Sequence, residues 1–316
     1  MFHSILRAMR ILLTGASGML GSAVSRQLRM IYQNSVISCP SRSQLDLLDD
    51  IAVKRYLISG DFELVIHCAA LVGGIKANID HPFEYLNTNI RIDSNVMQSS
   101  LELRIPRFMY MASSCMYPAV TSQPMLESQL LTGELEKTNE GYALAKLVGT
   151  KMVEAVANQL DWRAFVLSNL YGPGDKYEGG KSHLIAAIVN KVAIAAGKGS
   201  AEIEMWGSGK ARREFTYVED VAQYLVQMIE KLSSLPPIMN VGLGLDYSVR
   251  EYYEYVCQEF SYKGLVVPNL TQPEGMQRKL MDSSLARSHG WNPKIEIANG
   301  IRMTVNEFLI GSNTLK

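Results

Sequence analysis

Short apolar runs alternate with longer amphipathic stretches through the first half of the chain. Buried strands are predicted where consecutive residues are mainly apolar, at 10–14, 36–39, 64–68, 107–112 and 163–168. Helices are predicted where apolar residues recur at three- and four-residue spacing, at 22–31, 83–103 and 140–160. This alternation is typical of an α/β fold with a doubly wound parallel (Rossmann) sheet. Binding sites in such sheets collect at the carboxyl ends of the strands.

The pattern changes after about residue 171, where the composition shifts and the predicted elements become shorter. We therefore expect a dinucleotide-binding Rossmann domain over residues 9–171. A smaller mixed α/β domain, mainly over 172–316, is expected to bind the substrate, with some segments returning to the first domain. A chain of 316 residues is long enough to bury a core in each.

A glycine-rich loop, GASGMLG at 15–21, joins the first strand to the first helix. Gly15 allows a tight turn, Gly18 lets the backbone approach a pyrophosphate, and Gly21 lets the helix pack closely on the strand. The alternative is a strand-to-helix turn that binds nothing, but the strand before and the helix after favour a dinucleotide. The remaining loop residues expected at the cofactor are Ser17, Met19 and Leu20. At other strand ends they are Ala69, Asn169 and Leu170.

The end of the second strand decides between NAD and NADP in such folds. The sequence there is PSRS at 40–43, with no carboxylate before Asp46. Arg42 and the hydroxyls beside it favour the 2′-phosphate of NADP, although Arg42 also fits a solvated loop. Asp46 is expected either to cap the following helix or to contact the adenine.

Composition and charge exclude several classes of partner. Lys+Arg and Asp+Glu are both 31, so the net charge is zero, and no basic block indicates nucleic acid. No apolar run reaches the ~18 residues needed to span a membrane. The four cysteines are scattered without the spacing of a metal site, which is typical of reduced thiols in a cytoplasmic protein.

A tyrosine and a lysine four residues apart, Tyr142 and Lys146, share one face of a predicted helix. An ammonium about 4 Å from a phenol favours the phenolate by roughly 4 kcal/mol at an effective dielectric of ~20. The pKa of Tyr142 is therefore expected to fall from near 10 to roughly 7, suitable for proton transfer. Ser113, at the end of the fourth strand, could bind the same substrate oxygen.

Other residues with reactive side chains have a structural interpretation as well as a functional one. His67 lies in a buried strand and is expected to be a satisfied core residue. Cys115 is either a small buried residue or a base, and His183 either caps a helix or acts as an acid. Four basic residues could bind a second diphosphate, although each could equally be a surface charge: Lys191, Arg213, Arg278 and Lys279.

These motifs together resemble the extended short-chain dehydrogenase/reductase family, and within it the 3,5-epimerase/4-reductases of GDP-4-keto sugars. The resemblance runs from residue 10 to about 308. The glycine loop and the Tyr-Lys pair are general to the family. The narrower marks are VGGI at 72–75, SSCMYP at 113–118, PMLE at 124–127, TNEGYALAK at 138–146, NLYGP at 169–173, WGSG at 206–209 and REF at 213–215.

The resemblance implies a role for each matching residue. Ser113, Tyr142 and Lys146 would form the reductase triad, and Cys115 and His183 would serve epimerisation. Arg42 falls where the family holds the 2′-phosphate, whereas Ser17 stands where some members carry an arginine, which weakens the preference for NADP. Lys146 and His183 would also touch the cofactor. The implied contacts to the GDP-sugar are Lys191, Trp206, Arg213 and Glu274.

The implied function is NADP(H)-dependent conversion of GDP-4-keto-6-deoxy-D-mannose to GDP-L-fucose, with no metal. Alternatives are the same chemistry on a dideoxyhexose leading to colitose or on a heptose, or C4 reduction alone. A 4,6-dehydratase would need an acidic pair where Cys115 and Met116 stand. A non-catalytic dinucleotide sensor would not need Tyr142 and Lys146. The apolar surface of the helices 83–103 and 140–160 predicts a homodimer.

Overall fold

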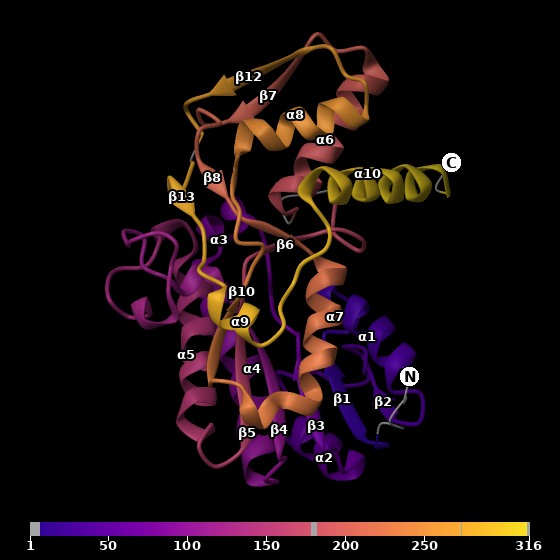
Figure 1. The fold of residues 1–316 in the computed structure, drawn as a ribbon, viewed down its shortest axis with the longest axis vertical. Helices are drawn as coiled ribbons and strands as arrows, with labels where there is room; N and C mark the ends of the chain where they lie inside the picture. The colour runs from indigo at the N-terminus through magenta and orange to yellow at the C-terminus, as the bar shows by residue number, and fades with distance from the viewer. Residues whose placement is uncertain (1–6, 178–181, 273, 315–316) are drawn as a thin grey trace.

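Six parallel strands form the central sheet of the protein (Figure 1). The structure is a computed structural model that describes residues 7–177, 182–272 and 274–314. The strand order is β10-β5-β4-β3-β1-β2. In chain order the strands are β1 (Arg10–Thr14), β2 (Val36–Ser38), β3 (Leu64–His67), β4 (Arg107–Ser113), β5 (Asp161–Leu167) and β10 (Ile238–Val241). The predicted doubly wound parallel sheet is confirmed.

Helices cover both faces of the sheet, which explains why its strands are apolar on both sides. One face packs against α1 (Met19–Ile31) and α7 (Val218–Met228), and the other against α2 (Asp50–Gly60), α4 (Pro82–Glu102) and α5 (Glu140–Val156). Alternation along β1 shows the pattern: Ile11 and Leu13 join the first core and Leu12 joins the second. Each such side chain, when fully buried, contributes about 1.5–3 kcal/mol.

A smaller group of elements lies beyond the carboxyl ends of the strands, at the top of Figure 1. It has its own apolar core, centred on Ile188, Val192 and Tyr252. The helices are α6 (Leu184–Lys198), α8 (Val249–Glu259) and α10 (Ile297–Thr314). The short strand pairings are β7 (Glu202–Trp206) with β12 (Leu265–Asn269), β6 (Asn169–Tyr171) with β9 (Phe215–Tyr217), and β8 (Arg212–Arg213) with β11 (Tyr247–Ser248) and β13 (Arg278–Lys279).

Short elements complete the described chain. These are α3 (Ile75–Asp80), α9 (Ser284–Ser288) and the 3-10 helices η1 (Ser114–Met116), η2 (Glu127–Gln129), η3 (Lys137–Asn139) and η4 (Ile229–Ser234). Among the described residues, no helix combines the length and apolar character needed to cross a bilayer.

Several element boundaries differ from the sequence-based prediction. Helix α1 begins at Met19 rather than at 22, because Gly18 already stands in the N-cap position. Helix α5 ends at Val156, since residues 157–160 turn to lead the chain into β5. Asp46 does not cap α2: its Oδ1 accepts the N–H of Leu48, whereas Asp49 provides the cap by accepting the N–H of Ala52. Helix α8 was not predicted.

The order in which successive strands are added reverses at β1, which pairs with β2 on one side and β3 on the other. At such a point the connections leave in opposite directions, and a crevice opens above the carboxyl ends of the strands. Strand β10 comes from the second half of the chain and extends the sheet beyond β5.

Candidate active site

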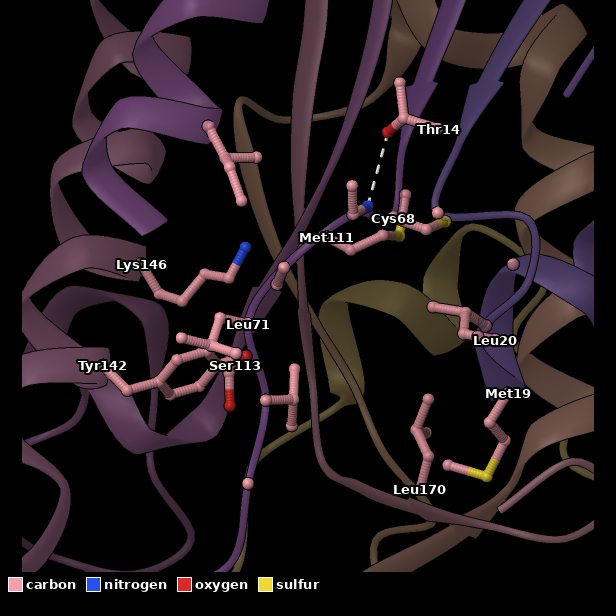
Figure 2. A pocket seen from close by; sticks show the side chains of 18 of the residues that line it. Thr14, Met19, Leu20, Cys68, Leu71, Met111, Ser113, Tyr142, Lys146 and Leu170 are labelled. Carbon is pink, nitrogen blue, oxygen red and sulfur yellow. Dashed lines mark hydrogen bonds between the residues drawn. The ribbon is translucent and has the colours of Figure 1, made fainter. Parts of the chain in front are cut away.

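One cavity of about 580 Å³ lies above the carboxyl ends of β1, β3 and β4. It is lined by the five predicted catalytic residues, Ser113, Cys115, Tyr142, Lys146 and His183. It is also lined by the predicted cofactor residues Gly15, Ser17, Gly18, Met19, Leu20, Gly21, Arg42, Asp46, Ala69, Asn169 and Leu170. Figure 2 shows Ser113, Tyr142 and Lys146 on one wall and Met19, Leu20 and Leu170 on the opposite wall.

The secondary structure explains how the wall that carries Ser113, Tyr142 and Lys146 is built. Strand β4 ends at Ser113, and the 3-10 turn η1 then places Cys115 beside it, so that the Cys115 N–H donates to Ser113 Oγ at 3.4 Å. Helix α5 starts at Glu140, which puts Tyr142 in its first turn and Lys146 one turn later. Because residues four apart lie on the same face of a helix, the side chains of Tyr142 and Lys146 are on the same face of α5.

The glycine loop has the geometry that a dinucleotide requires. Gly15 has φ +70, and a Cβ there would lie 2.6 Å from the Ala69 nitrogen. A Cβ on Gly21 would lie 2.1 Å from the Gly15 carbonyl oxygen, so the helix approaches the turn more closely than any side chain permits. Gly18 is the N-cap of α1, and both Gly18 and the first residues of the helix line the cavity, where a helix N-terminus offers N–H groups to phosphates. The residues present therefore fit a nicotinamide dinucleotide.

A buried polar network holds Lys146 and corrects the predicted acidity of Tyr142. Lys146 Nζ lies 3.6 Å from Asp93 Oδ2, and Tyr110 donates to the same oxygen. Burial, together with the charges of Cys115 and Asp93, raises the pKa of Tyr142 well above its ordinary value. The prediction of a pKa near 7 is wrong, because burial of the phenol raises its pKa. The charge of Asp93, which the Tyr-x-x-x-Lys motif does not reveal, acts in the same direction.

The network continues from Asp93 to the glycine loop. His67 Nε2 lies 3.0 Å from Asp93 Oδ1, and His67 Nδ1 lies 2.7 Å from Thr14 Oγ1. Thr14 Oγ1 in turn accepts the Ala69 N–H, as the dashed line in Figure 2 shows. An Nε2–H tautomer satisfies every member of this chain. His67 is therefore a satisfied core residue, as predicted.

His183 lies at the N-terminus of α6, but its side chain makes no capping hydrogen bond. Its Nδ1 instead lies 2.8 Å from Asp175 Oδ1. Burial alone would lower the pKa of His183, but the hydrogen bond to Asp175 and its charge outweigh burial, so the pKa is raised. The interpretation of His183 as a simple helix cap is not supported.

Cys115 is buried, and burial raises the pKa of its thiol. The positive charges of Lys279 and Lys146 and the hydrogen bond with Ser113 act in the opposite direction. Lys279 lines the same cavity, where burial lowers the pKa of its ammonium. Cations that face a thiol stabilise the thiolate, which is the reactive form.

Apart from Lys279, the predicted substrate residues lie outside this cavity lining, in the smaller part of the molecule. Lys191 Nζ stands 5.4 Å from the ring centroid of Trp206, and Arg213 donates to the Glu274 carbonyl at 2.7 Å. The parallel register of β8 and β13 places Arg213 beside Lys279, which connects this cluster to the cavity.

Arg278 is less available for a ligand than was predicted. Its Nε lies 2.5 Å from Asp246 Oδ2, and Arg212 binds the other oxygen of the same carboxylate. Arg278 therefore contributes to the structure of the β8–β13 pair.

Asp93 and Asp175 were not predicted from the sequence. Asp93 lies on α4 four residues after Asn89 and three before Val96, both of which are buried. A charged residue on the buried face of a helix requires a partner, so helical periodicity alone could have identified it. Asp175 follows a Gly-Pro-Gly turn, and no sequence spacing connects it to His183. Across the described residues, no cluster of His, Cys, Asp and Glu could hold a metal ion.

Comparison with known proteins shows the family of this chain. Residues 11–242 match the model of the NAD dependent epimerase/dehydratase family. The chain is 38% identical to the GDP-L-colitose synthase of Yersinia pseudotuberculosis, over 96% of this chain and 99% of that protein. It is 37% identical to the GDP-L-fucose synthase of Azorhizobium caulinodans, over 96% and 97%.

A solved structure, the GDP-mannoheptose C4 reductase of Campylobacter jejuni with NADP bound, superimposes with a TM-score of 0.86 at 27% identity, over 96% of this chain and 98% of that one. The family match, the relatives and the cavity agree: this chain belongs to the NAD dependent epimerase/dehydratase family and is an enzyme that uses a nicotinamide dinucleotide.

Proposed function

We propose that the protein is an NADPH-dependent 3,5-epimerase/4-reductase of a GDP-4-keto-6-deoxy sugar. The leading reaction is the conversion of GDP-4-keto-6-deoxy-D-mannose to GDP-L-fucose. One observation carries the proposal: a single cavity brings a second acid–base pair, Cys115 and His183, to the reductase group of Ser113, Tyr142 and Lys146. A reductase without epimerisation has no use for that second pair.

The residues divide the chemistry as follows. A keto group at C4 acidifies the hydrogens at C3 and C5. The Cys115 thiolate removes one of these protons, and the electron pair moves onto the keto oxygen, which accepts hydrogen bonds from Ser113 and Tyr142. The His183 imidazolium then returns a proton to the carbon from the other face, which inverts the centre. Cys115 and His183 recover their starting protonation states by exchange with water.

Reduction of the C4 carbonyl uses Tyr142 and Lys146. The cofactor, when bound, supplies the hydride that reduces the C4 carbonyl. Tyr142 donates its phenolic proton to the C4 oxygen, and the pKa raised by burial keeps that proton in place until it is needed. Lys146 holds the adjacent positive charge that stabilises the resulting phenolate.

The preference for NADPH rests on Arg42. It is exposed, lines the cavity, and forms no ion pair with another described residue, so its guanidinium is free for a 2′-phosphate. The GDP moiety is expected at the cluster of Lys191, Trp206, Arg213 and Glu274. Trp206 offers an aromatic face and the basic side chains offer charge for a diphosphate.

The same chemistry on a dideoxy sugar is the second candidate. The chain is 38% identical to a GDP-L-colitose synthase and 37% identical to a GDP-L-fucose synthase. The first similarity supports a GDP-4-keto dideoxyhexose substrate as strongly as the second supports the route to GDP-L-fucose. The two substrates differ at C3, where a dideoxy sugar has no stereocentre to invert. The similarity to a GDP-mannoheptose C4 reductase supports a heptose substrate as the third candidate.

Exchange of substrate hydrogens with solvent tests the proposal without the reduction step. In D2O and without NADPH, the enzyme should place deuterium at C3 and C5 of GDP-4-keto-6-deoxymannose. Cys115→Ser should slow this exchange by on the order of a hundredfold, because the hydroxyl is a far weaker base. Undiminished exchange in that variant would remove Cys115 from the mechanism.

A further inference from the structure

The least expected feature of the cavity is the carboxylate beside His183. Asp175 lies in the turn after β6, and its side chain is 4% exposed, whereas that of His183 is 35% exposed. Its Oδ1 lies 2.8 Å from His183 Nδ1 and also accepts the Lys176 N–H at 2.8 Å. Its Oδ2 is buried and has no hydrogen-bond partner among the residues that the structure describes. A buried carboxylate directed at a histidine needs an explanation.

This arrangement engages only one of the two ring nitrogens of His183. His183 Nδ1 is engaged by Asp175, whereas Nε2 makes no hydrogen bond to a described residue. Because both residues line the cavity, the unengaged nitrogen is the one that can serve a ligand. A carboxylate on the far nitrogen fixes the ring orientation and the tautomer.

We propose that Asp175 is the positioning residue of His183: it holds Nδ1–H and thereby presents Nε2–H to the bound sugar as the proton donor of epimerisation. This inference rests on the proposed function of the cavity. In each turnover the Nε2 proton passes to the sugar carbon and leaves a neutral imidazole bound to Asp175. The exposed part of the ring then regains a proton from water.

The other charged groups near His183 do not replace Asp175. Lys176 is the neighbouring cation, and its charge lowers the pKa of His183. Glu307, on α10, is occupied by the Gly174 N–H and the Tyr177 hydroxyl. The remaining titratable groups that share the cavity are Arg42, Asp46, Cys68, Cys115, Tyr142, Lys146 and Lys279. Of the groups that act on His183, Asp175 is therefore the one that favours the imidazolium.

Nuclear magnetic resonance titration of the histidine rings tests this directly in the ligand-free protein. The protein has five histidines, and His183→Gln assigns the resonance. In the wild type we expect His183 to titrate with a midpoint above the ordinary value for histidine. In Asp175→Asn we expect this midpoint to be lower than in the wild type. Lys176→Met should raise the midpoint, and Glu307→Gln, on α10 beside the same turn, should leave it unchanged. An Asp175→Asn midpoint equal to that of the wild type would overturn the proposal.

Kinetics supply the second readout. Because the imidazolium is the donor, exchange at C3 and C5 should fall as pH rises through the His183 pKa. In Asp175→Asn that fall should begin at lower pH, with a loss on the order of tenfold to a hundredfold at neutral pH. Asp175→Glu should restore the wild-type profile in part.

The two proposals fail in distinguishable ways. The ring titration needs no substrate, so a shifted midpoint in a protein without turnover would contradict only the proposed function. Turnover with an unshifted midpoint would contradict only the role of Asp175. If Asp175→Asn does not fold, a wild-type His183 midpoint below the ordinary value would still overturn the proposal.

Discussion

At the residue scale, the protonation state of Tyr142 depends on its surroundings more than on its nearest lysine. Burial raises its pKa, and Asp93 shares the charge of Lys146. Tyr142 is thus a proton donor in the resting protein. Tyr142→Phe should lower the reduction rate by about 10²–10⁴-fold, because the C4 oxygen loses its acid. NADPH binding, followed by fluorescence, should remain. Full activity in this variant would refute the triad.

Lys279 is expected to control the reactivity of Cys115. Its positive charge lowers the pKa of that thiol, against the effect of burial. In Lys279→Met, alkylation of Cys115 should therefore require a higher pH. Peptide-resolved mass spectrometry measures this, with Cys39 and Cys257 as internal controls in the same sample. An unchanged pH dependence would show that Lys279 has no part in thiolate formation.

The sequence predicted residues that lie in motifs better than residues that support them. Tyr142, Lys146 and Ser113 fall at the strand end and helix turn where the pattern placed them, and their catalytic roles stay predictions. Asp93 was missed although the periodicity of α4 places it on the buried face of that helix, and Asp175 was missed because no motif spacing connects it to His183, eight residues further along the chain. The pKa of Tyr142 was predicted wrongly because the helical spacing shows the nearby lysine but not the burial of the phenol, which raises the pKa.

At the element scale, α4 and α5 are joined by charge as well as by apolar packing. Asp93 of α4 faces Lys146 of α5, and both side chains are 2% exposed. Asp93→Asn should lower the free energy of unfolding by about 3–5 kcal/mol, because Lys146 would be buried without its counter-charge. The matched control is Asp80→Asn, which breaks the exposed pair with Lys76 and should cost about 0–1 kcal/mol. Equal losses in denaturant unfolding would contradict this ranking.

The contact between α1 and the glycine loop leaves no space for a side chain. Gly21→Ala would place a Cβ 2.1 Å from the Gly15 carbonyl, which the backbone must relieve by shifting. We expect a loss of about 1–3 kcal/mol in stability and weaker NADPH binding. Gly197→Ala, in α6, meets no atom within 4 Å and should be neutral or stabilising by about 0.5–1 kcal/mol. Wild-type NADPH affinity in Gly21→Ala would contradict the proposed pyrophosphate position.

Element boundaries depended on details that periodicity does not contain. The apolar repeat of α5 continues to residue 160, yet the helix ends at Val156, where the turn into β5 begins. The connection to β5 therefore outweighs the local apolar pattern at this boundary.

At the scale of the whole molecule, the second half of the chain completes the first. Strand β10 and helix α7 return to the central sheet, while the β8–β13 pair extends from the cavity towards the cluster at Arg213. The change in composition at residue 171 predicted a second unit. It could not predict β10 as the edge of the first sheet, because strand order is fixed by pairing between distant segments.

The outer surface of α4 and α5 is the proposed dimer contact. Phe83 is 76% exposed, Leu144 38% and Val148 42%, which leaves apolar side chains on two helices that pack against each other. A double substitution, Leu144→Asp with Val148→Asp, should yield a monomer in light scattering. Val120→Asp, at a loop position that is 93% exposed, should leave the assembly unchanged. A wild-type protein that is already monomeric would contradict the dimer.

The most direct test of the account combines both half-reactions in one vessel. NADPH consumption is measured with GDP-4-keto-6-deoxy-D-mannose, and the product is analysed by proton NMR. We predict that NADPH is oxidised and that the product is GDP-L-fucose, inverted at C3 and C5 and reduced at C4. NADPH oxidation to a product with both centres unchanged would contradict it, because Cys115 and His183 would then have no reaction to catalyse.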